Sequence, residues 1–129
     1  MTDGRLLLDT HALIWWAGGD RALSRKVRRL MEDETTEVVV SAASAWEIAT
    51  KVRLGRLRWT GPTSIEAYCA EQRFELLPMT FAHADRAGAW PLAHGDPFDR
   101  MLAAQSEIER ISLATNDTQL TAFGIQTIW

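Results

Sequence analysis

The sequence predicts an α/β fold in which helices cover both faces of a parallel sheet. Three observations support this prediction. Short apolar segments alternate with helical patterns along the whole chain. The apolar segments lack the strict apolar–polar alternation of half-exposed strands, which is typical of parallel strands buried on both faces. At 129 residues and 47% hydrophobic composition, the chain has the size of one domain with a substantial core, so we expect residues 1–129 to form a single domain.

The N-terminal third of the chain contains two predicted strands and two predicted helices. The apolar run RLLLD (5–9) ends in an acid, and a helix over 10–19 follows it and stops at a pair of glycines. Residues 23–34 repeat apolar side chains at helical spacing, with Ser24 in place to cap the N-terminus. The β-branched run EVVVS (37–41) then predicts a buried strand.

The rest of the chain continues the alternation. The predicted helices end at glycines or begin after residues that favour a helix start, and the strands between them are short and apolar. Helices are predicted over 44–55, 63–73, 80–90, 96–110 and 116–124, and strands over 74–78, 111–115 and 125–129.

Composition excludes several classes of protein. With 14 basic and 17 acidic residues, the net charge of −3 gives no strong overall attraction to nucleic acid, so RNA contacts require local patches. The single cysteine, Cys69, cannot form an internal disulfide, and we expect it to be buried in a protein of a reducing compartment. The chain shows no signal-peptide pattern and no apolar run of about 18 residues. We therefore expect a cytoplasmic protein without a membrane segment.

Four acidic residues stand where predicted strands give way to helices. Asp9 and Asp117 follow strands, and Glu47 and Asp99 lie in the predicted first turns of helices. Ligand sites of parallel α/β sheets form outside the carboxyl ends of the strands. Four carboxylates at that edge repel one another unless a cation binds, and Mg²⁺ and Mn²⁺ prefer carboxylate and water oxygens. The pattern therefore predicts a site for one of these ions.

Helix capping offers an alternative explanation for most of these acids, because Asp and Glu are favoured at helix starts. The segments SAWE (44–47) and TSIE (63–66) both match the capping-box pattern. In DPFD (96–99), the aspartates fit the N-cap and N3 positions around a proline at N1. Asp9, which closes an apolar strand, has the weakest structural explanation.

Four segments in a fixed order carry a resemblance to a known family: LLLDTHALIWW, VSAASAWEIATKVRLGRL, PLAHGDPFDRMLAAQ and LATNDTQLTAFG. Together they resemble the PIN-domain ribonucleases, in particular the VapC toxins of bacterial toxin–antitoxin pairs. The resemblance extends from Leu6 to Trp129. It implies a three-layer α/β/α sandwich with a central parallel sheet of four or five strands.

The resemblance also implies which residues carry the chemistry. The family's acids correspond to Asp9, Glu47, Asp99 and Asp117, as catalytic residues and ligands of Mg²⁺ or Mn²⁺. A hydroxyl near the last acid assists in many relatives, and Thr10 or Thr115 can serve here. Asp96 belongs to the motif without being a usual metal ligand.

The implied activity is metal-dependent endoribonuclease cleavage of RNA, which leaves a 5′-phosphate and a 3′-hydroxyl. The implied partners are RNA, a VapB-type antitoxin and a second copy of the chain. Basic residues that follow Glu47 on and after its helix are candidate RNA contacts: Lys51, Arg53 and Arg56. A catalytically silent PIN-like module that binds RNA or a protein is the alternative, although all four acids are present.

The aromatic residues and histidines give weaker signals. Trp15 and Trp16 are adjacent on one predicted helix, so one of them is expected to lie on an exposed patch for a partner. The tryptophans at 46, 90 and 129 are expected to pack in or beside the core. The histidines at 11, 83 and 94 are not at metal-ligand spacing, so a structural role is expected and zinc is not.

Overall fold

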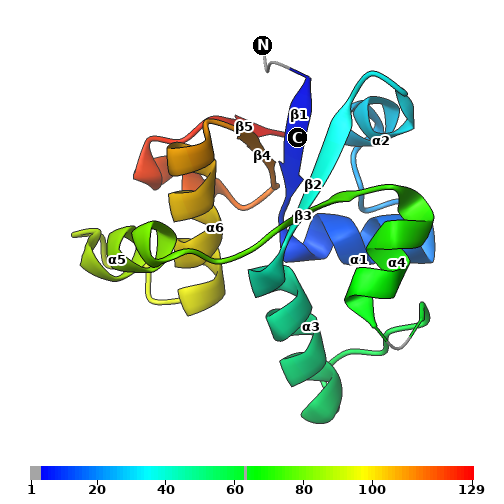
Figure 1. The fold of residues 1–129 in the computed structure, drawn as a ribbon, viewed down its shortest axis with the longest axis horizontal. Coiled ribbons are helices and arrows are strands. Elements are labelled where there is room, and N and C mark those ends of the chain that lie inside the picture. Colours follow the sequence, from blue (N-terminus) through cyan, green and yellow to red (C-terminus); the bar gives the residue numbers. More distant parts are fainter. Residues whose placement is uncertain (1–3, 63) are drawn as a thin grey trace.

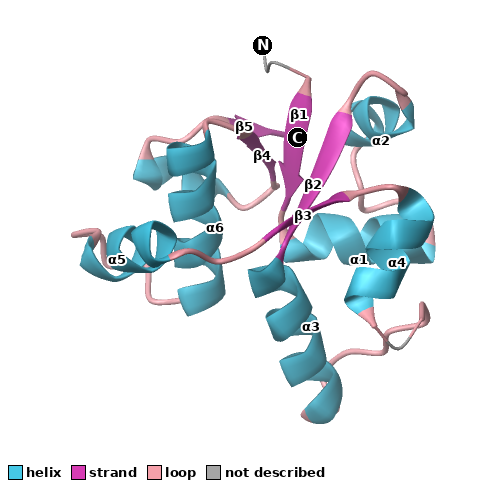
Figure 2. Ribbon diagram, viewed as in Figure 1, coloured by secondary structure: helices cyan, strands magenta, loops and turns pink. Residues whose placement is uncertain are grey.

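A five-stranded sheet forms the centre of the protein, which a computed structural model describes over residues 4–62 and 64–129. All four strand pairings are parallel, and the strand order is β3-β2-β1-β4-β5 (Figures 1 and 2). The strands are β1 (Arg5–Leu8), β2 (Glu37–Ser41), β3 (Glu75–Leu77), β4 (Ser112–Ala114) and β5 (Thr127–Ile128). The prediction of a parallel α/β fold is therefore confirmed, with five strands.

Helices lie on both sides of this sheet. They are α1 (Thr10–Gly18), α2 (Arg25–Glu32), α3 (Ala42–Arg53), α4 (Ile65–Gln72), α5 (Phe81–Ala89), α6 (Pro97–Glu109) and the 3₁₀ helix η1 (Thr118–Phe123). Figure 1 shows α1, α2 and α4 on one side and α5 and α6 on the other, with the sheet nearly edge-on between them. The helix α3 leaves the carboxyl edge of the sheet and contacts both α1 and α6.

Side chains of the central strands alternate between two hydrophobic cores. In β1, Leu6 and Leu8 pack into the core under α1, α2 and α4, whereas Leu7 packs into the core under α5 and α6. In β2, Val39 joins the second core and its two neighbours join the first. Both faces of these strands are buried, which explains their continuous apolar sequence.

Several helix ends follow the predicted capping residues. Ser24 caps α2, Asp96 caps α6 with Pro97 in the first turn, and Gly19 and Gly124 end their helices in the left-handed conformation. Glycine adopts that conformation without a Cβ clash, so these ends follow from local sequence.

The predicted start of α3 is wrong. The helix begins at Ala42 instead of residue 44, because the Ser41 hydroxyl at the end of β2 accepts the Ala43 N–H at 2.9 Å. Ser44 is buried inside the helix, so SAWE is no capping box and Glu47 lies in the second turn. The TSIE capping box begins at Thr63, which lies outside the described residues; Ser64 caps α4.

The tryptophans depart from two expectations. Trp15 and Trp16 are both partly buried: Trp15 meets Trp129 edge to face, and Trp16 packs near Phe74. Trp46 is 56% exposed, so the expectation that it packs with the core is wrong. Trp90 and Cys69 are buried, as expected.

None of the helices in residues 4–62 and 64–129 combines the length and the apolar character needed to cross a bilayer.

Candidate functional site

The strand order places a topological switch point at the carboxyl ends of β1 and β4. These two strands are neighbours, yet the chain leaves β1 toward α1 on one face and leaves β4 toward η1, which packs into the core on the other face. Such a divergence is the usual position of a ligand site in an open parallel sheet. Asp9 follows β1 directly, and Asp117 follows β4 as the N-cap of η1.

Asp9 is buried at the start of α1. Its side chain accepts the Ala12 N–H at 2.7 Å and a hydrogen bond from the Thr115 hydroxyl. Burial raises the pKa of Asp9 above its ordinary value, the two hydrogen bonds lower it in part, and the negative charge of Asp99 raises it further. Asp9 therefore acts as an N-cap, but its burial beside another acid exceeds what capping requires.

Thr115 links the two acids that follow β1 and β4. It hydrogen-bonds the Asp9 side chain, and its Oγ1 accepts the backbone N–H of Asp117 at 3.1 Å. The Thr10 hydroxyl instead donates to Ser44 on α3 at 3.1 Å. Of the two predicted hydroxyl residues, Thr115 is thus the one connected to the acids.

Asp99 and Asp96 have the separate positions that the DPFD pattern predicts. Asp96 accepts the backbone N–H groups of Phe98 and Asp99, at 2.9 and 3.1 Å. Asp99 has no such cap role, and its Oδ2 accepts a hydrogen bond from His94 Nε2 at 3.0 Å. Burial raises the pKa of Asp99, the His94 hydrogen bond lowers it, and the charges of Asp96 and Glu47 raise it.

Glu47 is buried on α3, where Lys51 one turn later donates to its Oε2 at 2.6 Å. Trp46 directly precedes Glu47, and Phe98 directly precedes Asp99. The Trp46 and Phe98 rings meet edge to face, with ring centroids 4.8 Å apart. This aromatic contact fixes α3 against the start of α6, and so it brings Glu47 toward Asp99. The contact gives the partly exposed Trp46 a positioning role.

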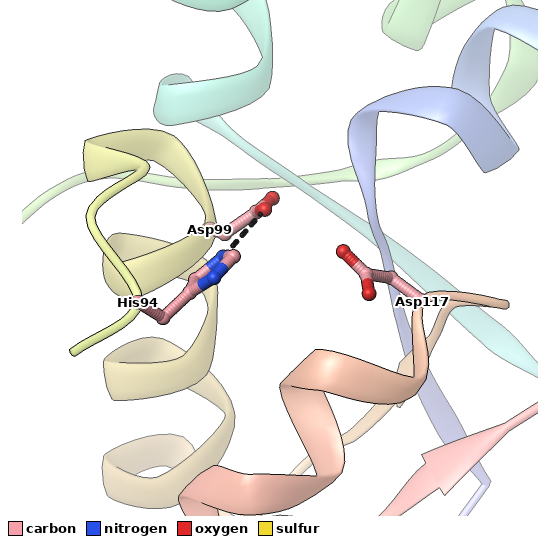
Figure 3. A group of neighbouring side chains, drawn as sticks. All are labelled: His94, Asp99 and Asp117. Atoms are coloured by element: carbon pink, nitrogen blue, oxygen red, sulfur yellow. Dashed lines mark hydrogen bonds and ion pairs between the residues drawn. The ribbon is translucent and has the colours of Figure 1, made fainter. Parts of the chain in front are cut away.

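The four predicted acids therefore converge. The charge of Asp99 affects the pKa of Asp9, the charge of Glu47 affects that of Asp99, and Asp99 and Asp117 approach each other directly. The sequence reasoning did not connect one further residue with these acids. His94 Nε2 and one carboxylate oxygen each of Asp99 and Asp117 all lie within 4.8 Å of one another (Figure 3).

The signal for His94 was its place in the HGDPFD segment, two residues before the N-cap of α6. The sequence analysis expected a structural role for His94 and did not connect it with Asp99 and Asp117, whose carboxylates its Nε2 approaches in the structure. His83 does match that expectation: it is buried, accepts the Thr80 N–H at Nδ1 and donates from Nε2 to Glu109 at 2.9 Å. His11 is exposed and its ring lies against Trp15.

Arg100 holds the loop that carries His94. Its guanidinium donates to the backbone carbonyls of Ala87, Trp90, Leu92 and His94, at 2.5 to 2.8 Å. A planar guanidinium has several donors in fixed directions, so one side chain can connect several turns of a loop. Arg100 follows Asp99 in the chain, which ties the loop to the acid that His94 contacts.

The donor set fits a divalent cation. Carboxylate oxygens suit Mg²⁺ and Mn²⁺, and an imidazole nitrogen suits transition ions such as Mn²⁺. Within residues 4–62 and 64–129, Asp9, Asp99 and Asp117 form no ion pair with a Lys or Arg, whereas Glu47 pairs with Lys51. The three acids without a basic partner are the ones whose negative charges a bound cation would stabilise most.

We expect Mg²⁺ to stabilise the fold. A ligand at ten times its Kd adds about 1.4 kcal/mol, which raises the melting temperature by about 5 °C for a domain of this size. The melting temperature should be measured with MgCl₂ and with NaCl of equal ionic strength. Asp99→Asn should remove the Mg²⁺ effect and leave the metal-free protein as stable or slightly more stable, because it removes a buried like charge. Equal shifts with both salts would contradict a preformed site.

Comparison with known proteins identifies the family. The profile of the PIN domain matches residues 6–125. The chain belongs to the PIN-domain family. Among characterised relatives, it is 32% identical over 90 residues to Ribonuclease VapC16 of Mycobacterium tuberculosis, strain ATCC 25618 / H37Rv. That match covers 54% of this chain and 64% of the relative's length.

Solved structures agree on the fold. VapBC2 from Rickettsia felis, bound to a DNA fragment from its promoter, superposes with a TM-score of 0.70 at 13% identity and covers 97% of this chain and 98% of its own. VapC20 of Mycobacterium tuberculosis, a toxin that cleaves the sarcin–ricin loop, superposes with a TM-score of 0.60 at 18% identity and covers 93% and 95%. The predicted PIN-like sandwich is thus confirmed.

Proposed function

We propose that this PIN domain is a Mg²⁺- or Mn²⁺-dependent endoribonuclease and the toxin of a toxin–antitoxin pair. The observation that carries the proposal is the convergence of Asp9, Glu47, Asp99 and Asp117 at the carboxyl ends of β1 and β4. The similarity to a VapC ribonuclease and to VapC structures supports it. Residues 1–129 then act as a single catalytic domain.

The residues divide the work of phosphodiester hydrolysis. Asp9, Asp99 and Asp117 would hold the cation, which would polarise the phosphoryl group and lower the pKa of a bound water. Thr115 keeps Asp9 and the backbone of Asp117 in place through its two hydrogen bonds. Glu47, the acid that Lys51 already neutralises, orients the attacking water and accepts its proton.

Cleavage of RNA tests the proposal. Purified protein should be incubated with a structured RNA in Mg²⁺, in Mg²⁺ with excess EDTA, and as the Asp9→Ala variant in Mg²⁺. We expect cleavage in the first reaction alone, with 5′-phosphate and 3′-hydroxyl ends. Equal cleavage in all three would show a contaminating nuclease, and no cleavage despite bound metal would favour the catalytically silent module.

The basic residues beyond Glu47 form the proposed RNA rim. Lys51 was predicted as an RNA contact, but its ammonium is bonded to Glu47 and so belongs to the acidic site. Arg53 and Arg56 are exposed at and just after the end of α3, past this site. They are the stronger candidates for contacts with phosphates that flank the cleaved bond.

Charge reversal tests this rim. The double variant Arg53→Glu, Arg56→Glu should weaken RNA binding by about tenfold at 50 mM salt and reduce the dependence of binding on salt. Binding should be measured with the cleavage-deficient Asp9→Ala background. The matched control is Arg25→Glu, Arg29→Glu on α2, which should change binding little. Unchanged RNA binding in the Arg53→Glu, Arg56→Glu variant would exclude the proposed RNA rim.

The antitoxin is proposed to occupy an apolar groove beside α3. A cavity of about 410 Å³ lies between β2, β3, α3 and α4, and a second one, of about 410 Å³, continues along α3; Ile65 lines both. An amphipathic segment of a VapB-type partner fits such a groove. The product of a small reading frame beside this gene should co-purify with the protein, and Ala45→Arg, which fills the first cavity, should abolish co-purification.

A homodimer is proposed through the exposed apolar strip that contains Leu76, Met79 and Phe81, of which Phe81 is 90% exposed. The strip lies on the edge strand β3 and the start of α5, where unpaired strand edges favour association. Light scattering should show a dimer that Phe81→Asp converts to a monomer. A monomeric parent protein would contradict this arrangement.

A further inference from the structure

The cation site contains a nitrogen atom as well as oxygen atoms. His94 Nε2 lies 3.0 Å from Asp99 Oδ2, and both approach an Asp117 oxygen to within 4.8 Å. Adjacent ligands of a six-coordinate ion with bonds of about 2.1 Å lie about 3 Å apart, so this pair has the separation of two neighbouring ligands. Figure 3 shows the Asp117 carboxylate facing the His94–Asp99 pair across the intervening space.

Besides its hydrogen bond to Asp99, the imidazole is held in this position by two contacts. Arg100 Nη1 donates to the His94 carbonyl at 2.8 Å, which fixes the backbone. The His94 ring meets Phe123 of η1 edge to face, with centroids 5.9 Å apart. Since Asp117 caps the same short helix, His94 is placed between the two elements that supply the acids. A ring fixed in this way loses little conformational entropy when it binds an ion.

We propose that His94 Nε2 is a ligand of the divalent cation, so that the site binds Mn²⁺ in preference to Mg²⁺. This inference rests on the proposed metal-dependent function and adds the identity of the ion. Mg²⁺ takes oxygen ligands almost exclusively, whereas first-row transition ions accept imidazole readily. To bind an ion through Nε2, the neutral ring would carry its single proton on Nδ1, so coordination would require the Nδ1–H tautomer.

Binding measurements with Mn²⁺ and Mg²⁺ test the proposal without any activity assay. His94→Gln keeps a side chain that can donate to Asp99 and offers an oxygen ligand in place of nitrogen. Titration calorimetry should show that Mn²⁺ affinity falls about tenfold, while Mg²⁺ affinity changes by less than about threefold. An unchanged ratio of Mn²⁺ to Mg²⁺ affinity would overturn the proposal.

Pulsed electron paramagnetic resonance of the Mn²⁺-bound protein gives a direct second readout. The parent protein should show coupling to a directly bound ¹⁴N nucleus, and His94→Gln should lose it. The matched control is His11→Gln, because His11 also lies near Asp9 and lowers the pKa of that carboxyl. This variant should keep the coupling to ¹⁴N.

The outcomes separate two failures. Bound Mn²⁺ without nitrogen coupling in the parent protein, or coupling lost in His11→Gln instead, overturns the role of His94 and leaves the proposed function standing. Failure to bind either Mn²⁺ or Mg²⁺ overturns both. The presence or absence of nitrogen coupling is measured in the parent protein itself. Misfolding of a variant therefore does not affect this test of the role of His94.

Discussion

Asp99→Asn is expected to reduce RNA cleavage by about a thousandfold, which corresponds to about 4 kcal/mol of activation free energy. The variant removes one negative charge from the acids that would hold the cation, while asparagine keeps the shape of the side chain and an oxygen that can accept from His94. The rate should be measured in single-turnover reactions over a range of Mg²⁺ concentrations.

Asp96→Asn is the matched control, three residues away in the same motif. Asn caps helices about as well as Asp, so the hydrogen bonds to Phe98 and Asp99 are retained and cleavage should fall by less than about threefold. Similar losses in the two variants would mean that the motif acts through the helix start alone, and would contradict the metal role of Asp99.

Replacing Arg100 by Met should produce the largest loss of stability among the substitutions considered. The change leaves carbonyls of Ala87, Trp90, Leu92 and His94 without their shared donor. Hydrogen bonds from a charged donor contribute about 1.5–3 kcal/mol each, and water replaces some of them in this partly buried loop. We expect a loss of about 3 kcal/mol and a fall in melting temperature of about 10 °C.

Two further variants make the Arg100 prediction specific. Arg100→Lys keeps the charge but cannot reach several carbonyls at once, so it should lose most of the same stability. Arg86→Met removes an exposed pair with Glu107 and a contact over the Trp90 ring, and should cost about 1 kcal/mol. If chemical denaturation gives equal losses for Arg86→Met and Arg100→Met, the loop does not depend on Arg100.

Much of the fold follows from local patterns in the chain. The five apolar segments predicted five strands, and their lack of apolar–polar alternation predicted a parallel sheet with two covered faces. Capping at Ser24 and Asp96 is local chemistry between a side chain and the next helical turn, so both were predicted correctly. The positions of Asp9 and Asp117 at strand ends likewise followed from sequence order.

Other features depend on contacts between segments that are distant in the sequence. Ser41 and Ser44 could each cap the start of α3. The register of β2 against β1 and β3 ends the strand at Ser41, so Ser41 is the cap. His94 joins the acids only because Arg100 folds its loop back against α6. Nothing in the local pattern of HGDPFD shows what lies opposite the histidine.

The residue sequence thus supplied the acids, their order and the strand ends that carry them, because these depend on hydrophobic periodicity and capping. Contacts between distant segments supplied the rest. The pairing of β4 with β1 set Thr115 between Asp9 and Asp117, and the loop that Arg100 holds set His94 beside Asp99. The physical reason is that charge pairing and ligand grouping depend on distance in space, which only the packed elements define.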